Sequence, residues 1–449
     1  MLKNVLLLVG MWGMGLGAAF VQLPATQNLL IDAGYKSIST APLGIIMLGS
    51  APCAVFIPKI ISRYGEKKTF IGGSIFGIIG ALLQMIGPLL SMNNVTTEVA
   101  LVVTGALPQA FMYASTNNLR FSVSQFSTPD FLPKATALVL LGGVLSALLG
   151  PLLSAVTRTM IPGALYAGNF LQIALMYVVF ATLAFFADFK PPIRESNDDG
   201  VRIDGDDLSL VETQQEQTAA GDGARIDINA SERTLLEIIK GTDLLLLITF
   251  QCLSYNIMAL YMGQLKLPMA ESGYSLDAFT YALTAHMLGM FLPGLFSGHV
   301  IHRFGTWSTT TFGFLLFPVG GAMFLINDSI AMFVLGITIV GIGWNFSFVG
   351  PSAEVSKIYS PAEQSKVVGF NDGIMLLTVG TIFVTASKIY LAIGSWDVFN
   401  YILMSLSVFS ALLSLMRGLC KWRESRRDDN SSGDSLAQSL LTAGSICTL

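Results

Sequence analysis

Charged residues are scarce in this chain. Lys, Arg, Asp and Glu together make up 12% of its 449 residues, whereas hydrophobic residues make up 53%. A soluble domain of this size could not cover its surface with so few polar side chains. The composition therefore excludes a soluble globular protein and predicts a protein that crosses a lipid bilayer many times.

Histidine and cysteine, frequent catalytic and metal-binding residues, are also few. The chain has three histidines and four cysteines, widely separated in the sequence. Their spacing fits neither a disulfide framework nor a metal site, and no phosphate-binding loop or pair of catalytic aspartates lies in an apolar run. We therefore expect no enzyme, no catalytic residue, no metal and no cofactor. The chain has no basic patch, which argues against nucleic acid as a partner.

Long apolar runs dominate what remains. A helix needs about 20 apolar residues to cross the hydrocarbon core, and six such runs lie on each side of a polar central segment. They are 4–30, 38–61, 69–90, 99–120, 134–157 and 164–187, then 243–265, 277–300, 309–326, 330–357, 367–390 and 398–419. The pattern predicts an all-α membrane protein with twelve transmembrane helices in two six-helix bundles.

Four regions follow from this pattern. We expect residues 1–187 to form the N-terminal bundle and residues 241–420 to form the C-terminal bundle. Residues 188–240 are acidic and poor in apolar side chains, which predicts a disordered linker. Residues 421–449 are predicted to be a disordered tail.

A short basic segment occurs once in each half. Pro58–Lys68 reads PKIISRYGEKK, and the segment from Gly298 reads GHVIHRFGT. Arg63 and Gly65 match Arg303 and Gly305 at an offset of 240 residues. Such repetition indicates two homologous halves, as in many secondary transporters.

Lysine and arginine are unevenly distributed between the two ends of the predicted helices. All but four of the 25 basic residues fall on the side that also holds both chain ends and both basic segments. The positive-inside rule therefore predicts that both termini are cytoplasmic. The choice between plasma membrane and organelle membrane does not follow from the sequence.

The basic segments resemble the signature loop of the major facilitator superfamily, Gly-x-x-x-Asp-Arg-x-Gly-Arg/Lys, which joins spans two and three and is repeated between spans eight and nine. The usual Asp is Ser62 in the first copy and His302 in the second. The stretch from Gly341 to Asp372 resembles spans ten and eleven of poorly characterised members. The resemblance implies a twelve-helix fold, with a cavity lined by spans one, four, seven and ten.

Polar side chains inside the spans are candidates for substrate binding, because such groups are costly in hydrocarbon. They are Gln22, Gln109, Tyr113, Gln251, Tyr255, Asn256, His286, Trp344 and Asn345. Hydrogen bonding between helices is the alternative role for these residues. An imidazole titrates near neutrality, so His286 could instead carry a proton for coupled transport.

Charged residues at the predicted cytoplasmic ends are candidates for gating. They are Arg63, Arg120, Arg303, Glu354 and Asp372. As a gate, Arg120 would pair with Glu354, and Asp372 would pair with Arg63 in place of the missing loop aspartate. The alternatives are side chains that extend to the membrane surface and, for Asp372, a carboxylate held by a helix dipole.

The sequence thus predicts a monomeric secondary active or facilitative transporter that moves a small organic solute by alternating access, with a proton as candidate coupling ion. Its partners would be the solute and the lipid bilayer. The alternative is a receptor or scaffold of the same fold that binds a ligand without transporting it.

Overall fold

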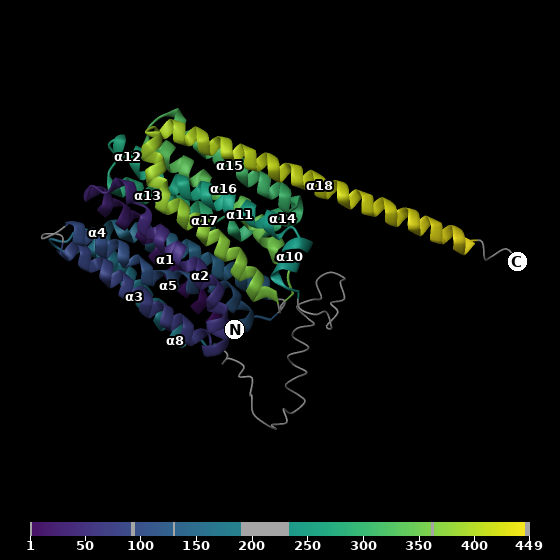
Figure 1. Cartoon of the computed structure of the whole chain (residues 1–449), viewed down its shortest axis with the longest axis horizontal. Coiled ribbons are helices and arrows are strands. Elements are labelled where there is room, and N and C mark those ends of the chain that lie inside the picture. Colours follow the sequence, from purple (N-terminus) through teal and green to yellow (C-terminus); the bar gives the residue numbers. More distant parts are fainter. Residues whose placement is uncertain (1, 91–94, 129–130, 190–232, 361–362, 445–449) are drawn as a thin grey trace, which may run out of the picture.

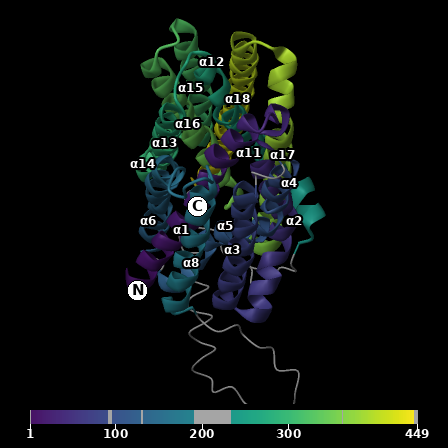
Figure 2. The same cartoon turned by 90° about the vertical axis from the view of Figure 1, so that its left-hand side faces the viewer.

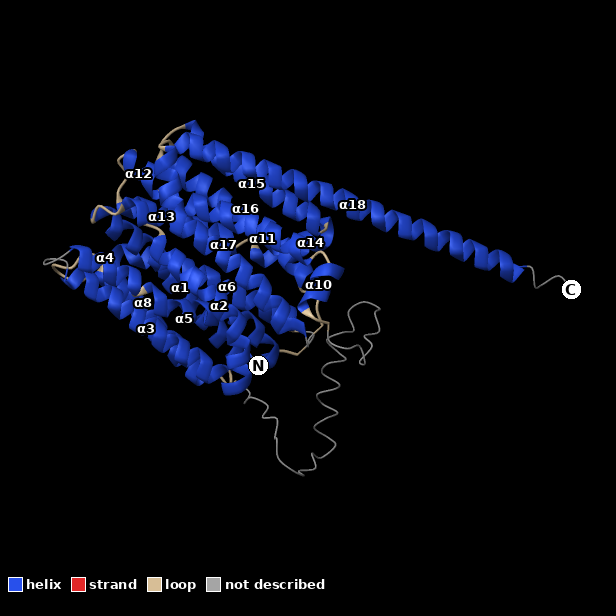
Figure 3. Ribbon diagram, viewed as in Figure 1, coloured by secondary structure: helices blue, strands red, loops and turns tan. Residues whose placement is uncertain are grey.

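The computed structural model describes residues 2–90, 95–128, 131–189, 233–360 and 363–444. Every regular element within these ranges is a helix, as Figure 3 shows by colour, and none of the described residues forms a strand. The predicted fold class is confirmed. The predicted linker between residues 190 and 232 lies outside the described residues.

The first half contains eight α-helices and one π-helical turn. They are α1 (Leu2–Asp32), α2 (Ala41–Tyr64), α3 (Glu66–Leu90), α4 (Val95–Thr104), α5 (Ala106–Ser122), α6 (Leu132–Ala147), the π turn Leu148–Leu152, α7 (Leu153–Thr157) and α8 (Ala167–Phe186). Helices α4 and α5 form one continuous apolar span, Val95–Ser122.

The second half follows the same plan after one short helix. Its elements are α10 (Leu235–Gly241), α11 (Leu244–Gln264), α12 (Lys266–Glu271), α13 (Leu276–Phe291), α14 (Gly294–Phe304), α15 (Thr306–Ile326), α16 (Ile330–Val355), α17 (Gln364–Ile393) and α18 (Trp396–Gly444). Helices α11 and α12 together form the apolar span Leu244–Glu271.

Ten helices in the described ranges are long and apolar enough to cross a membrane. Helices α13 and α14 meet at a 43° bend and together give an eleventh. The bend falls at Pro293, which cannot continue the hydrogen-bond ladder of the preceding helix. The predicted fifth span is occupied by a shorter apolar helix, Leu141–Thr157. Eleven of the twelve predicted spans are therefore long and apolar enough to cross a membrane, and the helix at the fifth is shorter.

The two halves lie side by side (Figures 1 and 2) and meet along two seams. In the first seam α2 packs along α17, and in the second α13 packs against α6 and the π turn. A Cβ atom at Gly44 would lie 2.8 Å from the carbonyl oxygen of Gly380, and one at Gly380 would lie 2.7 Å from the backbone nitrogen of Leu48. Small residues permit this backbone-to-backbone contact.

The two basic segments have the same backbone turn. Gly65 has φ 83° and ψ 157°, and Gly305 has φ 81° and ψ 159°. This region of conformational space is essentially restricted to glycine. In both copies the glycine amide donates a hydrogen bond to the carbonyl four residues earlier, which ends one helix and starts the next. The sequence repeat is thus also a structural repeat.

Two segments predicted to be disordered contain helix. Helix α10 begins within the predicted linker 188–240, where Thr234 and Glu237 form a capping box and Ile238 is buried. Helix α18 continues through the predicted tail to Gly444 and extends away from the bundles (Figure 1). Extending an existing helix costs less free energy than nucleating one, and Lys, Arg and Glu at the start of the tail are good helix formers.

Candidate functional site

We call the ends of the molecule inner and outer, after the predicted cytoplasmic and opposite sides. Between them, a group of aromatic side chains lies where the two halves meet. Tyr113 on α5 and Tyr255 on α11 are close enough for their hydroxyl groups to hydrogen-bond. The Tyr255 ring packs edge-on against Trp344 at 5.7 Å, and Trp344 stacks on Phe348 at 5.0 Å and 15°. These residues form the aromatic cluster.

The aromatic cluster contains three of the predicted substrate-binding residues, Tyr113, Tyr255 and Trp344. All three come from spans that the superfamily resemblance places around the cavity. Trp344 is 8% exposed, and its indole nitrogen has no hydrogen-bond partner among the described residues. A buried donor without a partner is costly, so the indole is available to a bound solute or water.

An ion pair between the halves lies nearer the inner end. A guanidinium nitrogen of Arg120 on α5 donates to Oδ2 of Asp372 on α17. Asn371 donates to the other carboxylate oxygen at 3.0 Å, and Gln251 donates to Asn371 at 2.9 Å. The side chain of Asp372 is 8% exposed and that of Arg120 is 26% exposed. We call this ion pair with its two amides the inner pair.

The inner pair corrects both predicted ion pairs. Asp372 pairs with Arg120 and not with Arg63, whose guanidinium lies over the adjacent Tyr64 ring at 5.4 Å. Glu354 accepts from Thr306 at 2.6 Å and from Lys357 at 3.0 Å instead of binding Arg120. The sequence could not show that helix packing turns Arg120 toward α17 rather than toward α16.

Arg303 follows the pattern of Arg63 in the other half. Its guanidinium lies 5.8 Å from the ring of the adjacent Phe304. Within the described part of the chain, neither arginine forms an ion pair with the opposite half.

Three other candidates make hydrogen bonds within one half. Gln109 donates to Gln84 at 2.7 Å inside the first bundle. Asn345 donates to the carbonyl of Met290 at 2.7 Å, next to the bend between α13 and α14. Gln251 belongs to the inner pair. For Gln109 and Asn345 the structure therefore favours the alternative role, hydrogen bonding between helices.

His286 is fully buried between α13 and α16. Its Nδ1 lies 2.7 Å from the carbonyl oxygen of Ile337, and its Nε2 has no partner among the described residues. The contact to Ile337 is the interhelical hydrogen bond that the sequence left open as the alternative to proton transfer. It fixes the ring but leaves one nitrogen available.

Two buried glutamines have no hydrogen-bond partner for either amide atom in the described structure. They are Gln22 on α1 and Gln264 on α11, both fully buried. Gln264 was not predicted, although Gln22-Leu23 and Gln264-Leu265 repeat at an offset of 242, close to that of the basic segments. Asn256, the remaining candidate, also has an unpartnered carbonyl oxygen.

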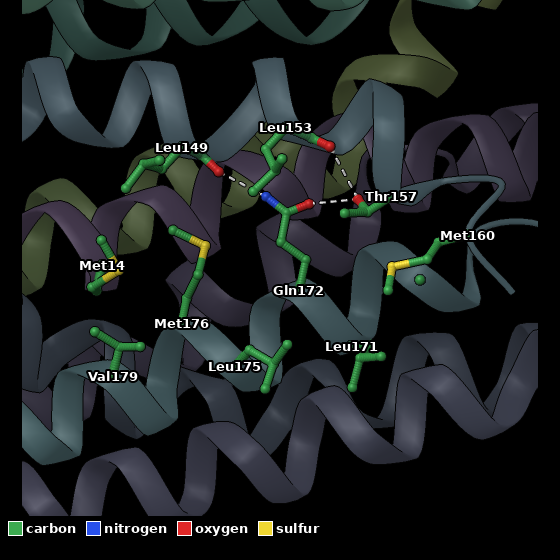
Figure 4. A pocket seen from close by; sticks show the side chains of 11 residues that line it. Met14, Leu149, Leu153, Thr157, Met160, Leu171, Gln172, Leu175, Met176 and Val179 are labelled. Carbon is green, nitrogen blue, oxygen red and sulfur yellow. Dashed lines mark hydrogen bonds between the residues drawn. The ribbon is translucent and has the colours of Figure 1, made fainter.

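A pocket lies within the first half. It has a volume of about 220 Å³ and lies between α1, the π turn, α7 and α8. Figure 4 shows Gln172 donating to the carbonyl of Leu149 and accepting from Thr157, so its amide is satisfied within the pocket wall. The other labelled side chains are apolar apart from Thr157. The pocket therefore has few polar groups left to orient a solute.

Among the described residues, no group of three or more His, Cys, Asp or Glu side chains lies close enough together to hold a metal ion. The buried polar groups described above are amides, hydroxyls, an indole, an imidazole and one ion pair. They suit recognition of an uncharged solute through hydrogen bonds and ring contacts.

Comparison with known proteins agrees with this architecture. Residues 244–445 match the family model of the Major Facilitator Superfamily. The riboflavin transporter RfnT of Brucella anthropi is 26% identical over 377 residues, which cover 84% of this chain and 85% of RfnT. The uncharacterized MFS-type transporter YddS of Bacillus subtilis is 23% identical over 423 residues, which cover 90% of this chain and 86% of YddS.

Among solved structures, the nucleoside transporter NupG covers 92% of this chain and 98% of its own, with a TM-score of 0.57 and 14% identity. Two helical bundles around a central contact are thus the fold of a multi-pass membrane transporter. By sequence, the chain is similar to members of the major facilitator superfamily, and it shares the fold of a solved transporter. The relatives are transporters and not enzymes.

Proposed function

We propose that the chain moves a small, uncharged organic solute with a flat aromatic ring by alternating access. The observation that carries this proposal is the aromatic cluster, in which side chains of both halves meet around a buried indole whose nitrogen has no hydrogen-bond partner among the described residues. Flat rings pack favourably against such side chains, and the unpartnered amides Gln22 and Gln264 offer donors and acceptors on α1 and α11. The riboflavin transporter among the relatives makes riboflavin the first solute to test.

The inner pair supports the alternating-access part of the proposal. It joins the two halves at the inner end, so the solute cannot leave in that direction until the pair separates. The Tyr359 hydroxyl lies close enough to interact electrostatically with both Arg120 and Asp372, and burial raises its pKa. The loop between α16 and α17 is therefore part of the same closed surface.

Uptake of labelled riboflavin into proteoliposomes tests the proposal directly. We expect saturable uptake that unlabelled riboflavin inhibits, and comparison with and without a proton gradient tests coupling. Binding without uptake would instead support the receptor alternative. Neither binding nor uptake of riboflavin or of a panel of ring-containing solutes would overturn the proposed ligand class.

The role of Trp344 gives a second test. Replacing it with alanine should weaken riboflavin binding about tenfold, which corresponds to about 1.4 kcal/mol, because a ring contact and a hydrogen-bond donor are lost. The matched control is Phe346→Ala on the same helix, since Phe346 packs against Phe296 and Phe312, which are about half exposed on the outside of the bundle. Equal losses from both variants would contradict a specific role for Trp344.

A further inference from the structure

A second ion pair joins the two halves, at the outer end of the molecule. Arg158 follows the last turn of α7, and Asp277 lies in the first turn of α13. A guanidinium nitrogen of Arg158 lies 3.3 Å from Oδ1 of Asp277. The side chains are 20% and 45% exposed, so this pair is more accessible to water than the inner pair.

A strained residue fixes the main chain that carries Arg158. Tyr166 has φ 71°, and it is the one residue other than glycine in the described ranges with a positive φ. Its amide donates to the carbonyl of Arg158 at 3.0 Å, and its hydroxyl donates to the carboxylate of Asp32 at the end of α1. Such a conformation persists only where surrounding contacts enforce it, and it is frequent at functional sites. The Arg158 loop is therefore held in a defined place on the first half.

The charges around this ion pair are balanced within each half. The first half contributes Asp32 and Arg158, and the second contributes Lys266 and Asp277. Lys266 is 9% exposed and lies within electrostatic reach of both Asp32 and Arg158. When the halves meet, each base faces an acid of the other half. When they separate, each half keeps one acid and one base, which limits the unpaired charge left behind.

The space left between the halves at this level is very small. A crevice of about 10 Å³ is lined by Asn28, Arg158, Tyr166 and Thr280, among others. This is about the room that one water molecule needs. A crevice of this size holds no organic solute.

We propose that Arg158 and Asp277 form the outer gate of the transporter and that separation of this ion pair opens the path to the outer side. The proposal rests on the alternating access of the proposed function but not on its ligand. The inner and outer ion pairs then close opposite ends of the same path. The structure represents the state in which both are closed.

Accessibility of a buried cysteine tests the gate without any solute. Thr280→Cys, placed in a variant without the four native cysteines, puts a thiol in the crevice, since Thr280 is 2% exposed. A membrane-impermeant maleimide is added to right-side-out vesicles and, separately, to inside-out vesicles, and the rate of thiol labelling is measured in each. Arg158→Asp and Asp277→Arg should each raise the rate from the outer side at least about fivefold. The variant that carries both Arg158→Asp and Asp277→Arg should label at the parent rate.

The matched control reverses a surface charge at the other end. Lys357→Glu breaks the pair with Glu354 and should leave the labelling rate of the Thr280→Cys background unchanged. Melting temperature and size-exclusion profile show whether each variant folds, and the milder variants Arg158→Gln and Asp277→Asn replace any that does not. Unchanged rates in folded single variants, or a double reversal that labels as fast as the single ones, would overturn the gate. If the variants label as expected but the parent protein does not transport riboflavin, the result contradicts the proposed ligand and leaves the gate intact.

Discussion

At the scale of single residues, Gly65 and Gly305 show why the basic segments repeat. Both glycines adopt the same conformation, which other residues reach only with strain. We predict that Gly65→Ala lowers the free energy of unfolding by about 1–3 kcal/mol. A lower thermal melting temperature of the purified protein in detergent would show this.

The control for this prediction is Gly72→Ala. Gly72 lies inside α3 with ordinary helical φ, and a Cβ atom there would meet nothing within 4 Å. Because alanine favours helix over glycine, this variant should be as stable as the parent or more stable. If Gly65→Ala melted at the same temperature as Gly72→Ala, the strain argument would fail.

At the scale of helices, the seam between α2 and α17 depends on two glycines in direct backbone contact. We predict that Gly380→Val reduces the rate of solute uptake into proteoliposomes at least about tenfold. Its side chain would meet the backbone of Leu48, which cannot move aside as a flexible side chain could. Gly298→Val is the control, because a Cβ atom at Gly298 meets nothing within 4 Å. Full transport by folded Gly380→Val would show that the seam is looser than described.

Helix α10 is attached to the loop between α16 and α17 by a second set of charges. The guanidinium of Arg233 donates to both carboxylate oxygens of Glu363, at 2.8 and 2.7 Å. The Arg233 side chain, together with backbone amides of Ser360 and Arg233, lowers the pKa of Glu363 to about 2. Lys366 donates to the carbonyl of Arg233 at 2.7 Å. These contacts hold the segment that leads into α10 against the loop between α16 and α17.

This attachment should depend on pH. A carboxyl group whose pKa is lower in the folded state stabilises that state fully above its ordinary value of about 4.5, and the contribution is lost as pH falls toward 2. We predict that amide hydrogen exchange in α10 is slow at pH 6 and faster, after correction for intrinsic rates, at pH 3. In Glu363→Gln, amide hydrogen exchange in α10 should be fast at both pH values. The same protection in parent and variant at pH 6 would exclude this anchoring role.

At the scale of the whole molecule, the inner pair should control which end opens. A cysteine that replaces Asn117, which lies on α5 one turn before Arg120, reports opening at this end. We predict that Asp372→Arg or Arg120→Asp alone exposes this cysteine to impermeant maleimide from the inner side, because like charges would then face each other across the halves. Exchanging the two charges should restore the parent labelling rate. Lys357→Glu serves again as the control at the same end. Failure of the exchange in a folded protein would mean that the amides of Asn371 and Gln251, and not the charges, hold this end closed.

Composition and periodicity were sufficient to predict the helical fold, the two halves and their matching turns, because these depend on local sequence. The partners of Arg120 and Asp372 were predicted wrongly, because pairing between halves depends on how each helix is rotated, and helices with little amphipathic pattern do not reveal this. From the sequence, Arg158 is only one of the four basic residues on the predicted outer side. Its role depends on Asp277, more than a hundred residues away in the other half.

The water-sized crevice at the outer end also bears on protons. Protons cross a membrane protein rapidly by hopping along an unbroken chain of hydrogen-bonded waters, and a crevice of about 10 Å³ holds one water at most. With both ends closed, the solute-free protein should therefore not dissipate a pH difference across the membrane that contains it.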